Sequence, residues 1–336
     1  MRIASLLLLV GCTLACGPSV SSSGEPAPRT ALSDLLGGTQ PNDALPSDGK
    51  ADDAHPARYT ELVALQSPVK NQGHRGLCSI FSSTALLEHL QIEAGRTPSD
   101  LSEQFLQWSA KHELERPYAG EASGITDVLD ALQRFGAVEG AQWPYDYFRW
   151  NATDDPACVG AVGTQPVRCL TNGEPPPAAL AAPRTRLPRW HQVPVASIQS
   201  HMTATRTAVV AAVEVFVQAW NDKLSPLRRN GDNFDHGIVL YPNDADVVAT
   251  RSRGSDGHAF LIVGWDDDLA LPLLDERGAP TVDASGAPVL ERGFYIFKNS
   301  YGTLEFGFKN PYGAGFGLVA KRYVETFGYA YGVDGP

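Results

Sequence analysis

Cys78 stands where a glycine-containing loop meets a long apolar segment that begins at Ser79. A thiol at the N-terminus of a helix faces unsatisfied backbone N–H groups and the positive end of the helix dipole, and both favour the thiolate. Gln72 lies six residues upstream and carries an amide that can donate a hydrogen bond to an oxyanion. The sequence therefore predicts an activated nucleophile beside an oxyanion donor.

A histidine and an amide are placed to complete such a site. A cysteine nucleophile needs a base, and a histidine base needs a group that orients its ring. Of the eight histidines, His258 follows a glycine and opens an apolar run of strand length that ends at Trp265. Asn299 follows a second strand-like segment, 293–298, and begins a turn signal. We therefore expect His258 to be the base and Asn299 to orient it.

These motifs, in this order, resemble the papain-like cysteine peptidases. The resemblance extends from about Pro68 to Tyr323, and Arg75-Gly76-x-Cys78 is similar to a bacterial branch of the family. The main motifs are Gln72-Gly73-x-x-Gly76-x-Cys78-x-x-Phe81-Ser82, Gly257-His258-Ala259 and Lys298-Asn299-Ser300-Tyr301-Gly302, and weaker echoes are Leu101-Ser102-Glu103-Gln104, Trp143-Pro144-Tyr145 and His236-Gly237-Ile238.

The sequence also departs from the family pattern. The family usually has a cysteine three residues before the nucleophile, where this chain has Arg75, so the usual first disulfide is missing. Ser79 replaces the tryptophan that follows the nucleophile, and Tyr301 replaces the tryptophan that shields the His–Asn hydrogen bond. The histidine and the asparagine are 41 residues apart, so the acidic segment Asp266–Arg292 is interpreted as an inserted hairpin or loop.

The resemblance implies an α+β, papain-like fold in two lobes. A helical lobe over about 58–190 would precede a β-barrel-like lobe over about 191–336, with the active-site cleft between them. It also implies hydrolysis of peptide bonds through an acyl-thioester on Cys78, with no cofactor and no metal. Gln72 and the Cys78 N–H would hold the oxyanion, His258 would protonate the leaving amine, and Asn299 would hold the imidazole.

Three alternatives share the fold. The chain could be an inactive papain-like binding module on the cell surface, or a transpeptidase that uses the same acyl-enzyme. It could also be a structural or adhesion protein whose cleft is blocked by the Asp266–Arg292 insertion. Among single residues, His74 is a rival base that lacks an orienting partner, His236 is expected to be structural on a strand or loop near the cleft, and Gly124 could pair with substrate backbone.

Composition limits the possible partners. The chain has 336 residues, of which 43% are hydrophobic, and a formal net charge of −11. An acidic chain without basic blocks is not expected to bind nucleic acid. Beyond the N-terminus no apolar run approaches the ~18 residues typical of a membrane span. We expect a monomer that acts on a peptide or protein substrate.

The N-terminus has the features of an export signal over 1–16. Arg2 precedes an apolar core, and Leu9-Val10-Gly11-Cys12 resembles a lipoprotein cleavage box, with a poorer copy ending at Cys16. Simple secretion with cleavage after Ala15 is the alternative. Residues 17–57 are rich in Gly, Pro, Ser and Asp, which predicts a flexible tether rather than a folded inhibitory propeptide. Its removal is expected to leave the activity unchanged.

Cys158 and Cys169 are expected to form a disulfide. They lie 11 residues apart in Pro- and Gly-rich surroundings, which suits an exported protein and leaves Cys78 unpaired. Metal ligation is the alternative, but no C-x-x-C and no histidine pair at zinc spacing accompany them.

Periodicity predicts helices in the first half of the chain and strands in the second. The triplet Asp266-Asp267-Asp268 is expected to be a solvated turn rather than a calcium site. Helices are predicted over 79–94, 101–112, 125–134 and 198–206, strands over 208–217, 258–265, 293–298 and 315–324, and an irregular crossing segment over 173–188.

Overall fold

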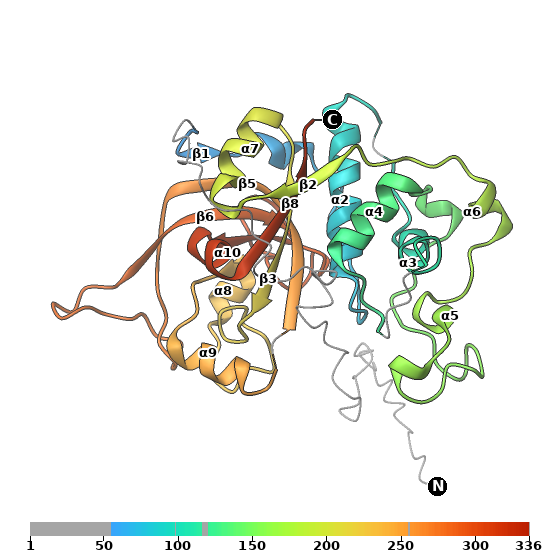
Figure 1. The fold of residues 1–336 in the computed structure, drawn as a ribbon. Coiled ribbons are helices and arrows are strands. Elements are labelled where there is room, and N and C mark those ends of the chain that lie inside the picture. Colours follow the sequence, from blue (N-terminus) through green and yellow to red (C-terminus); the bar gives the residue numbers. More distant parts are fainter. Residues whose placement is uncertain (1–54, 98, 116–119, 255, 336) are drawn as a thin grey trace, which may run out of the picture.

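The computed structural model describes residues 55–97, 99–115, 120–254 and 256–335. The predicted export signal and the tether up to residue 54 therefore lie outside the described residues. A helical lobe comes first, and a sheet with its own short helices follows it (Figure 1). The helical lobe contains α2 (Cys78–Glu93), α3 (Glu103–His112), α4 (Ile125–Arg134), α5 (Val167–Leu170) and α6 (Pro177–Ala181).

The second lobe is built on an open sheet. Among the described residues eight strands pair in the order β2-β8-β3-β5-β6-β7-β4, with β1 added to β5. All pairs are antiparallel except β4 with β7. The elements are β1 (Arg58–Tyr59), β2 (Trp190–Val193), α7 (Ile198–Thr205), β3 (Val209–Val215), α8 (Gly231–His236), β4 (Ile238–Val239), α9 (Asp244–Arg251), β5 (Asp256–Pro272), β6 (Leu290–Lys298), β7 (Phe316–Ala320), α10 (Lys321–Phe327) and β8 (Gly328–Val333).

The α+β class and the order of the lobes are confirmed, although "barrel-like" overstates a sheet that stays open. The main helices and strands begin within a few residues of their predicted positions, although β5 extends to Pro272, seven residues beyond its predicted end. One predicted strand, 315–324, is wrong in its second half, because β7 ends at Ala320 and α10 begins at Lys321. A short apolar run is compatible with either a strand or a buried helix. Here Tyr323 and Val324 belong to α10, and both are buried.

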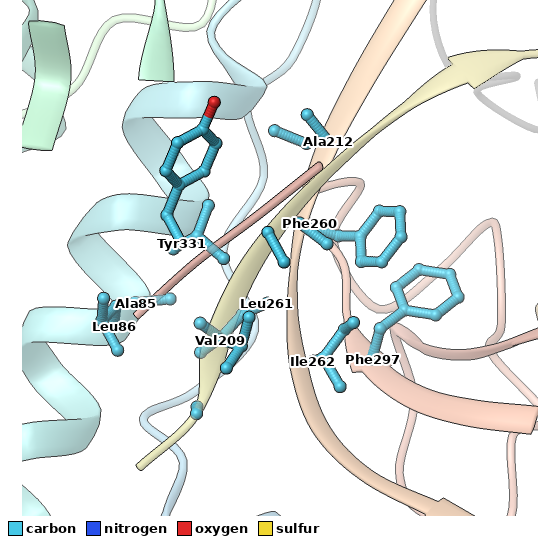
Figure 2. Packing of buried hydrophobic residues seen from close by; sticks show 14 of the residues in the cluster. Ala85, Leu86, Val209, Ala212, Phe260, Leu261, Ile262, Phe297 and Tyr331 are labelled. Atoms are coloured by element: carbon cyan, nitrogen blue, oxygen red, sulfur yellow. The ribbon is translucent and has the colours of Figure 1, made fainter. Parts of the chain in front are cut away.

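Helix α2 packs on one face of the sheet and fixes the position of Cys78. In Figure 2, Ala85 and Leu86 of α2 lie toward Val209 of β3, while Phe260 and Phe297 lie on the opposite side of the strands. Both faces are covered, because Phe260 and Phe297 pack against each other with centroids 4.5 Å apart and contact Trp220. A helix that is buried along most of its length holds its first residue rigidly against the sheet.

The described end of the predicted tether is attached to the sheet. The Trp265 indole donates to the Pro56 carbonyl at 2.8 Å, and the Asp267 N–H donates to the Ala57 carbonyl at 2.8 Å. Tyr59 then stacks on Trp265 with centroids 4.7 Å apart. Residues 55–57 therefore belong to the folded domain, and a truncation that tests the tether must keep them.

The Asp266–Arg292 segment is largely a hairpin. Strands β5 and β6 continue to pair through Pro272 and Leu290, and the hairpin projects from the side of the sheet away from the helical lobe (Figure 1). The aspartate triplet lies within β5, so the prediction of a solvated turn is wrong. Asp267 contributes to packing instead, because its carboxylate pairs with Lys321 at 2.7 Å.

A buried charge cluster joins the lobes. Lys70 Nζ contacts the carboxylates of Glu88 and Glu103, each at 2.7 Å. Lys298, at the end of β6, donates to the Ser67 hydroxyl at 2.7 Å, and that hydroxyl donates to Glu88. Burial lowers the pKa of Lys298 to about 8 and raises the pKa of Glu103 to about 7. The cluster therefore titrates in an accessible pH range.

Replacement of Lys298 by methionine should change the pH dependence of folding. The native lysine has a pKa of about 8, whereas the unfolded chain titrates near ~10.4. The native state binds fewer protons between these values, so this group makes stability rise with pH across that window and opposes folding below it. Urea unfolding from pH 7.5 to 10.5 should show a rise in the wild type that Lys298→Met lacks. Exposed Lys309→Met is the control, and an equal rise in both variants would contradict the assignment.

The predicted disulfide is confirmed. Cys158 and Cys169 are bonded, and Cys78 is the free cysteine of the described residues. The bond holds α5 against its preceding loop, next to Leu170, whose carbonyl accepts from Arg75 at 3.0 Å. The disulfide thus supports the region that surrounds the nucleophile loop.

Removal of this disulfide should cost stability without removing the nucleophile. A closed loop of this length stabilises a fold by about 3 kcal/mol, mainly by restricting the unfolded chain. The double variant Cys158→Ser/Cys169→Ser should therefore unfold at a lower temperature, measured by calorimetry, while Cys78 can still be alkylated. Two free thiols at these positions in the wild type, found by non-reducing peptide mapping, would refute the pairing.

Candidate active site

Cys78 is the first residue of α2 and is only 2% exposed. The loop before it is folded back on itself, because the Arg75 N–H donates to the Gln72 carbonyl and the Gln72 N–H donates to the Ser300 carbonyl at 2.8 Å. Backbone N–H groups of Ser79 and of Ala259 are directed at the sulfur. Since Ala259 belongs to β5, the thiol lies at the boundary between the lobes.

His258 and Asn299 meet as the sequence predicts. His258 lies in β5 and Asn299 directly follows β6, the neighbouring strand, so the hairpin closes the 41-residue separation. Nε2 of His258 and Oδ1 of Asn299 are 2.8 Å apart. The imidazole is 3% exposed, and this contact fixes its orientation.

Two aromatic residues enclose the imidazole. The Tyr301 ring lies 4.8 Å from the His258 ring with an interplanar angle of 32°, and its hydroxyl is 3.2 Å from Nδ1. Trp220 meets the imidazole edge-on with centroids 5.1 Å apart. Tyr301 thus occupies the covering position expected of it. Trp220 was missed, because its loop carries no motif that links it to His258.

Gln72 is buried beside the nucleophile loop. Its Nε2 donates to the Arg75 carbonyl at 2.8 Å, and its Oε1 accepts from the Ser300 hydroxyl at 2.6 Å. The Tyr145 hydroxyl donates to the Gln72 backbone carbonyl at 2.8 Å. These contacts fix the orientation of the Gln72 side-chain amide. A primary amide has two N–H groups, and one of them bonds the Arg75 carbonyl, so Nε2 has one more N–H to donate.

Burial shifts the pKa of both members of the pair. Burial raises the pKa of the Cys78 thiol to about 11. The backbone N–H groups of Ala259, Ser79 and Cys78 itself have the opposite, smaller effect. Burial also lowers the pKa of His258 to about 4, although the Asn299 contact raises it. Burial thus favours the neutral form of each group and opposes the thiolate that the helix N-terminus favours. The resting thiolate stays a prediction.

Arg75 is the main functional residue that sequence reasoning did not identify. Its guanidinium is fully buried and pairs with Glu121 at 2.5 Å. It also donates to the Gln104 side chain at 2.9 Å and to the carbonyls of Asp146 and Leu170. The sequence showed Arg75 in place of the family's cysteine, but it did not show the partners of the guanidinium. Arg75 fixes the nucleophile loop to four other segments.

The remaining candidates lie apart from this chemistry. His74 is exposed and stacks on Phe148 with centroids 5.4 Å apart. His236 ends α8 and bonds the Asp232 carbonyl, so its placement on a strand or loop is corrected to a helix terminus. Gly124 precedes α4 as its N-cap. No group of three or more His, Cys, Asp or Glu side chains that could hold a metal occurs among the described residues.

A hollow of about 760 Å³ opens beside the candidate site, and residues of both lobes line it. Tyr301 forms part of its wall and connects it to the imidazole, while Asn71 connects it to the nucleophile loop. Tyr145 and Tyr147 line the helical side, and Leu304 lines the opposite side. The space is large enough to hold several residues of an extended chain.

In the described part of the chain, no helix is long and apolar enough to cross a bilayer.

Comparison with known proteins identifies the fold. No family model and no curated protein sequence matches the chain. A structure of the cysteine protease and lectin-like domains of Cwp84, a surface layer associated protein of Clostridium difficile, has a TM-score of 0.52 at 18% identity, covering 82% of this chain and 51% of that one. A second structure of clostridial Cwp84, after propeptide cleavage, has a TM-score of 0.50 at 18% identity, covering 82% and 58%. Xylellain, a cysteine protease from Xylella fastidiosa, has a TM-score of 0.49 at 14% identity, covering 91% and 98%.

These similarities show the class of fold. The chain has the α+β fold of papain-like cysteine proteases, as its sequence motifs predict. It spans about half the length of the first Cwp84 structure. At this identity the comparison concerns the fold alone, and the chemistry must be argued from the side chains.

Proposed function

We propose that this protein is an exported cysteine-type peptidase that hydrolyses peptide bonds through a Cys-His-Asn mechanism. The observation that carries the proposal is the enclosed imidazole of His258, held by Asn299 at 2.8 Å and next in sequence to the residue whose N–H faces Cys78. Among the described residues, the free thiol of Cys78, an oriented base and an amide donor lie near the boundary of the two lobes. This combination is typical of acyl transfer.

The proposed reaction begins with a proton transfer. Nε2 of His258 is held by Asn299, so Nδ1 is the nitrogen that takes the proton of Cys78. The thiolate then attacks the peptide carbonyl, and the oxyanion is held by Nε2 of Gln72 and the Cys78 N–H at the start of α2. The imidazolium protonates the leaving amine, and the neutral ring then activates water to hydrolyse the acyl-enzyme.

Export is part of the proposal. The Cys158–Cys169 disulfide is of a kind that persists in oxidising compartments. One similar structure is described as surface layer associated. The lipoprotein motif at Cys12 or Cys16 predicts an anchored protein at the cell envelope, whereas cleavage after Ala15 predicts a secreted one. Mass analysis of the N-terminus from a bacterial host separates these outcomes.

An irreversible epoxide label tests the activity. The wild-type protein should be modified stoichiometrically at Cys78, located by peptide mapping, and Cys78→Ala should stay unmodified. A peptide-library cleavage profile should then identify the preferred bond, and added amine acceptors should reveal any transpeptidation. A folded wild type that neither reacts with the label nor cleaves any peptide would instead favour the inactive binding module.

A further inference from the structure

The hollow beside the candidate site lies on the side of the imidazole. Tyr301 covers the His258 ring with centroids 4.8 Å apart, and the same tyrosine forms part of the wall of the hollow. In the proposed reaction the imidazolium gives its proton to the leaving amine, so that amine must lie next to the ring. The hollow is therefore placed to hold residues on the leaving-amine side of the cleaved bond.

The walls of the hollow carry more negative than positive charge. Lys70 is the basic residue among those that line it, and its Nζ already lies 2.7 Å from each of three carboxylates. One of these, Asp100, also lines the hollow, and its side chain is 78% exposed. Glu305 is exposed on the opposite wall, and among the described residues no basic side chain pairs with it. A cation that enters the hollow would therefore meet carboxylates that attract it.

Exposed aromatic and apolar side chains accompany these carboxylates. Tyr145 and Tyr147 line the same wall as Asp100, and Tyr147 is 49% exposed. Leu304 precedes Glu305 and is 89% exposed, so the folded chain itself covers little of it. A lysine or arginine has an apolar stem that can lie along such surfaces and a charged head that can reach a carboxylate. A neutral apolar side chain would make only the first of these contacts, and an acidic one would be repelled.

We propose that the hollow selects substrates with a lysine or arginine among the first few residues after the cleaved bond, and that Asp100 and Glu305 on its two walls bind that side chain. This inference rests on the proposed function and names the substrate class of the same site. Both carboxylates are exposed to solvent, so each contact should be modest and sensitive to salt. The two residues thus determine which peptide is bound, while the bond is broken by other groups.

The test compares peptides that are identical up to the cleaved bond and differ after it. A peptide with lysine in this part should be cleaved with a kcat/KM roughly three- to tenfold higher than its glutamine counterpart, and about 0.5 M salt should reduce the difference. Asp100→Asn/Glu305→Gln should lose most of this preference while it cleaves the glutamine peptide at the wild-type rate. In this variant Lys70 keeps its contacts with Glu88 and Glu103, so the buried cluster stays paired.

A variant with the same change in net charge is the matched control. Asp268→Asn/Glu276→Gln removes two carboxylates from exposed positions of the Asp266–Arg292 segment, which does not line the hollow. It should keep the wild-type preference for the lysine peptide. An equal loss of preference in both double variants would mean that the net charge of the protein attracts basic peptides and that the hollow does not select them.

Two further results would overturn the inference: equal cleavage of the two peptides by the wild type, or an unchanged preference in Asp100→Asn/Glu305→Gln. Binding of the same peptides to Cys78→Ala, measured by fluorescence anisotropy, gives a readout without cleavage. The lysine peptide should bind with a lower Kd than the glutamine peptide, and equal binding would contradict the inference. If Cys78→Ala binds the lysine peptide more tightly but the wild type cleaves neither peptide, the proposed function fails and the role of the hollow stands.

Discussion

Cys78→Ala should abolish peptide hydrolysis, with kcat reduced by roughly 10⁶-fold, as for other residues that form the acyl-enzyme. No other described cysteine has a free thiol, because Cys158 and Cys169 are bonded to each other. The measurement is steady-state turnover of the best library peptide, after circular dichroism shows that the variant is folded. Full activity in Cys78→Ala would end the peptidase hypothesis.

The other groups should follow in a defined order. His258→Ala should be nearly as severe, since the thiol loses its proton acceptor and the amine its acid. Gln72→Ala should lower kcat by roughly 10²–10³, the usual loss for one oxyanion donor. Asn299→Ala should be the mildest, because Tyr301 and Trp220 still enclose the imidazole. A reversed order of Gln72 and Asn299 would show that the ring orientation matters more than the oxyanion donor.

Arg75→Met should have the largest effect on stability, lowering the free energy of unfolding by about 3–5 kcal/mol. The substitution leaves the Glu121 carboxylate buried without its cation, and it removes the donor that Gln104 and two backbone carbonyls share. Because Arg75 lies three residues before the nucleophile, the turnover of the folded fraction should fall as well. Urea unfolding and active-site titration measure the two effects separately.

Two matched variants make this prediction specific. Adding Glu121→Gln to Arg75→Met removes the uncompensated charge and should recover part of the lost stability. Arg206→Met removes an exposed arginine that contacts Glu61 and Glu93, and it should lower the free energy of unfolding far less than Arg75→Met, because solvent screens exposed ion pairs. If Arg75→Met were no worse than Arg206→Met, the buried pair would not be what holds the nucleophile loop.

The sequence predicted the parts of the fold that depend on strong local signals. The 125–134 helix has the predicted bounds, because an apolar stripe and a glycine define its ends. Residues 321–324 were predicted as strand but begin the α10 helix, where the Tyr323 hydroxyl donates to the Glu214 carbonyl. Local pattern contains no information on such a contact.

In the candidate site, too, local motifs were predictable and long-range contacts were not. Motifs identified Gln72, Cys78, His258 and Asn299, and the structure brings His258 and Asn299 within hydrogen-bonding distance. Their catalytic roles stay a prediction. The effect of burial on the pKa values of Cys78 and His258 could not be predicted, because desolvation depends on how deeply the two groups are buried. The partner of Arg75 was equally hidden, since Glu121 lies 46 residues further along the chain.

The attachment of residues 55–57 to β5 sets where this domain can be held from outside. Pro56 bonds Trp265, which lies seven residues along β5 from His258, about 23 Å at the usual rise of a strand. A support resin, a fluorescent protein or a bilayer joined ahead of His55 is therefore fastened beside the middle of β5, away from the imidazole near its start. Immobilisation through the N-terminal side should leave the approach to Cys78 unobstructed, so bound and free protein should react with a bulky epoxide at similar rates.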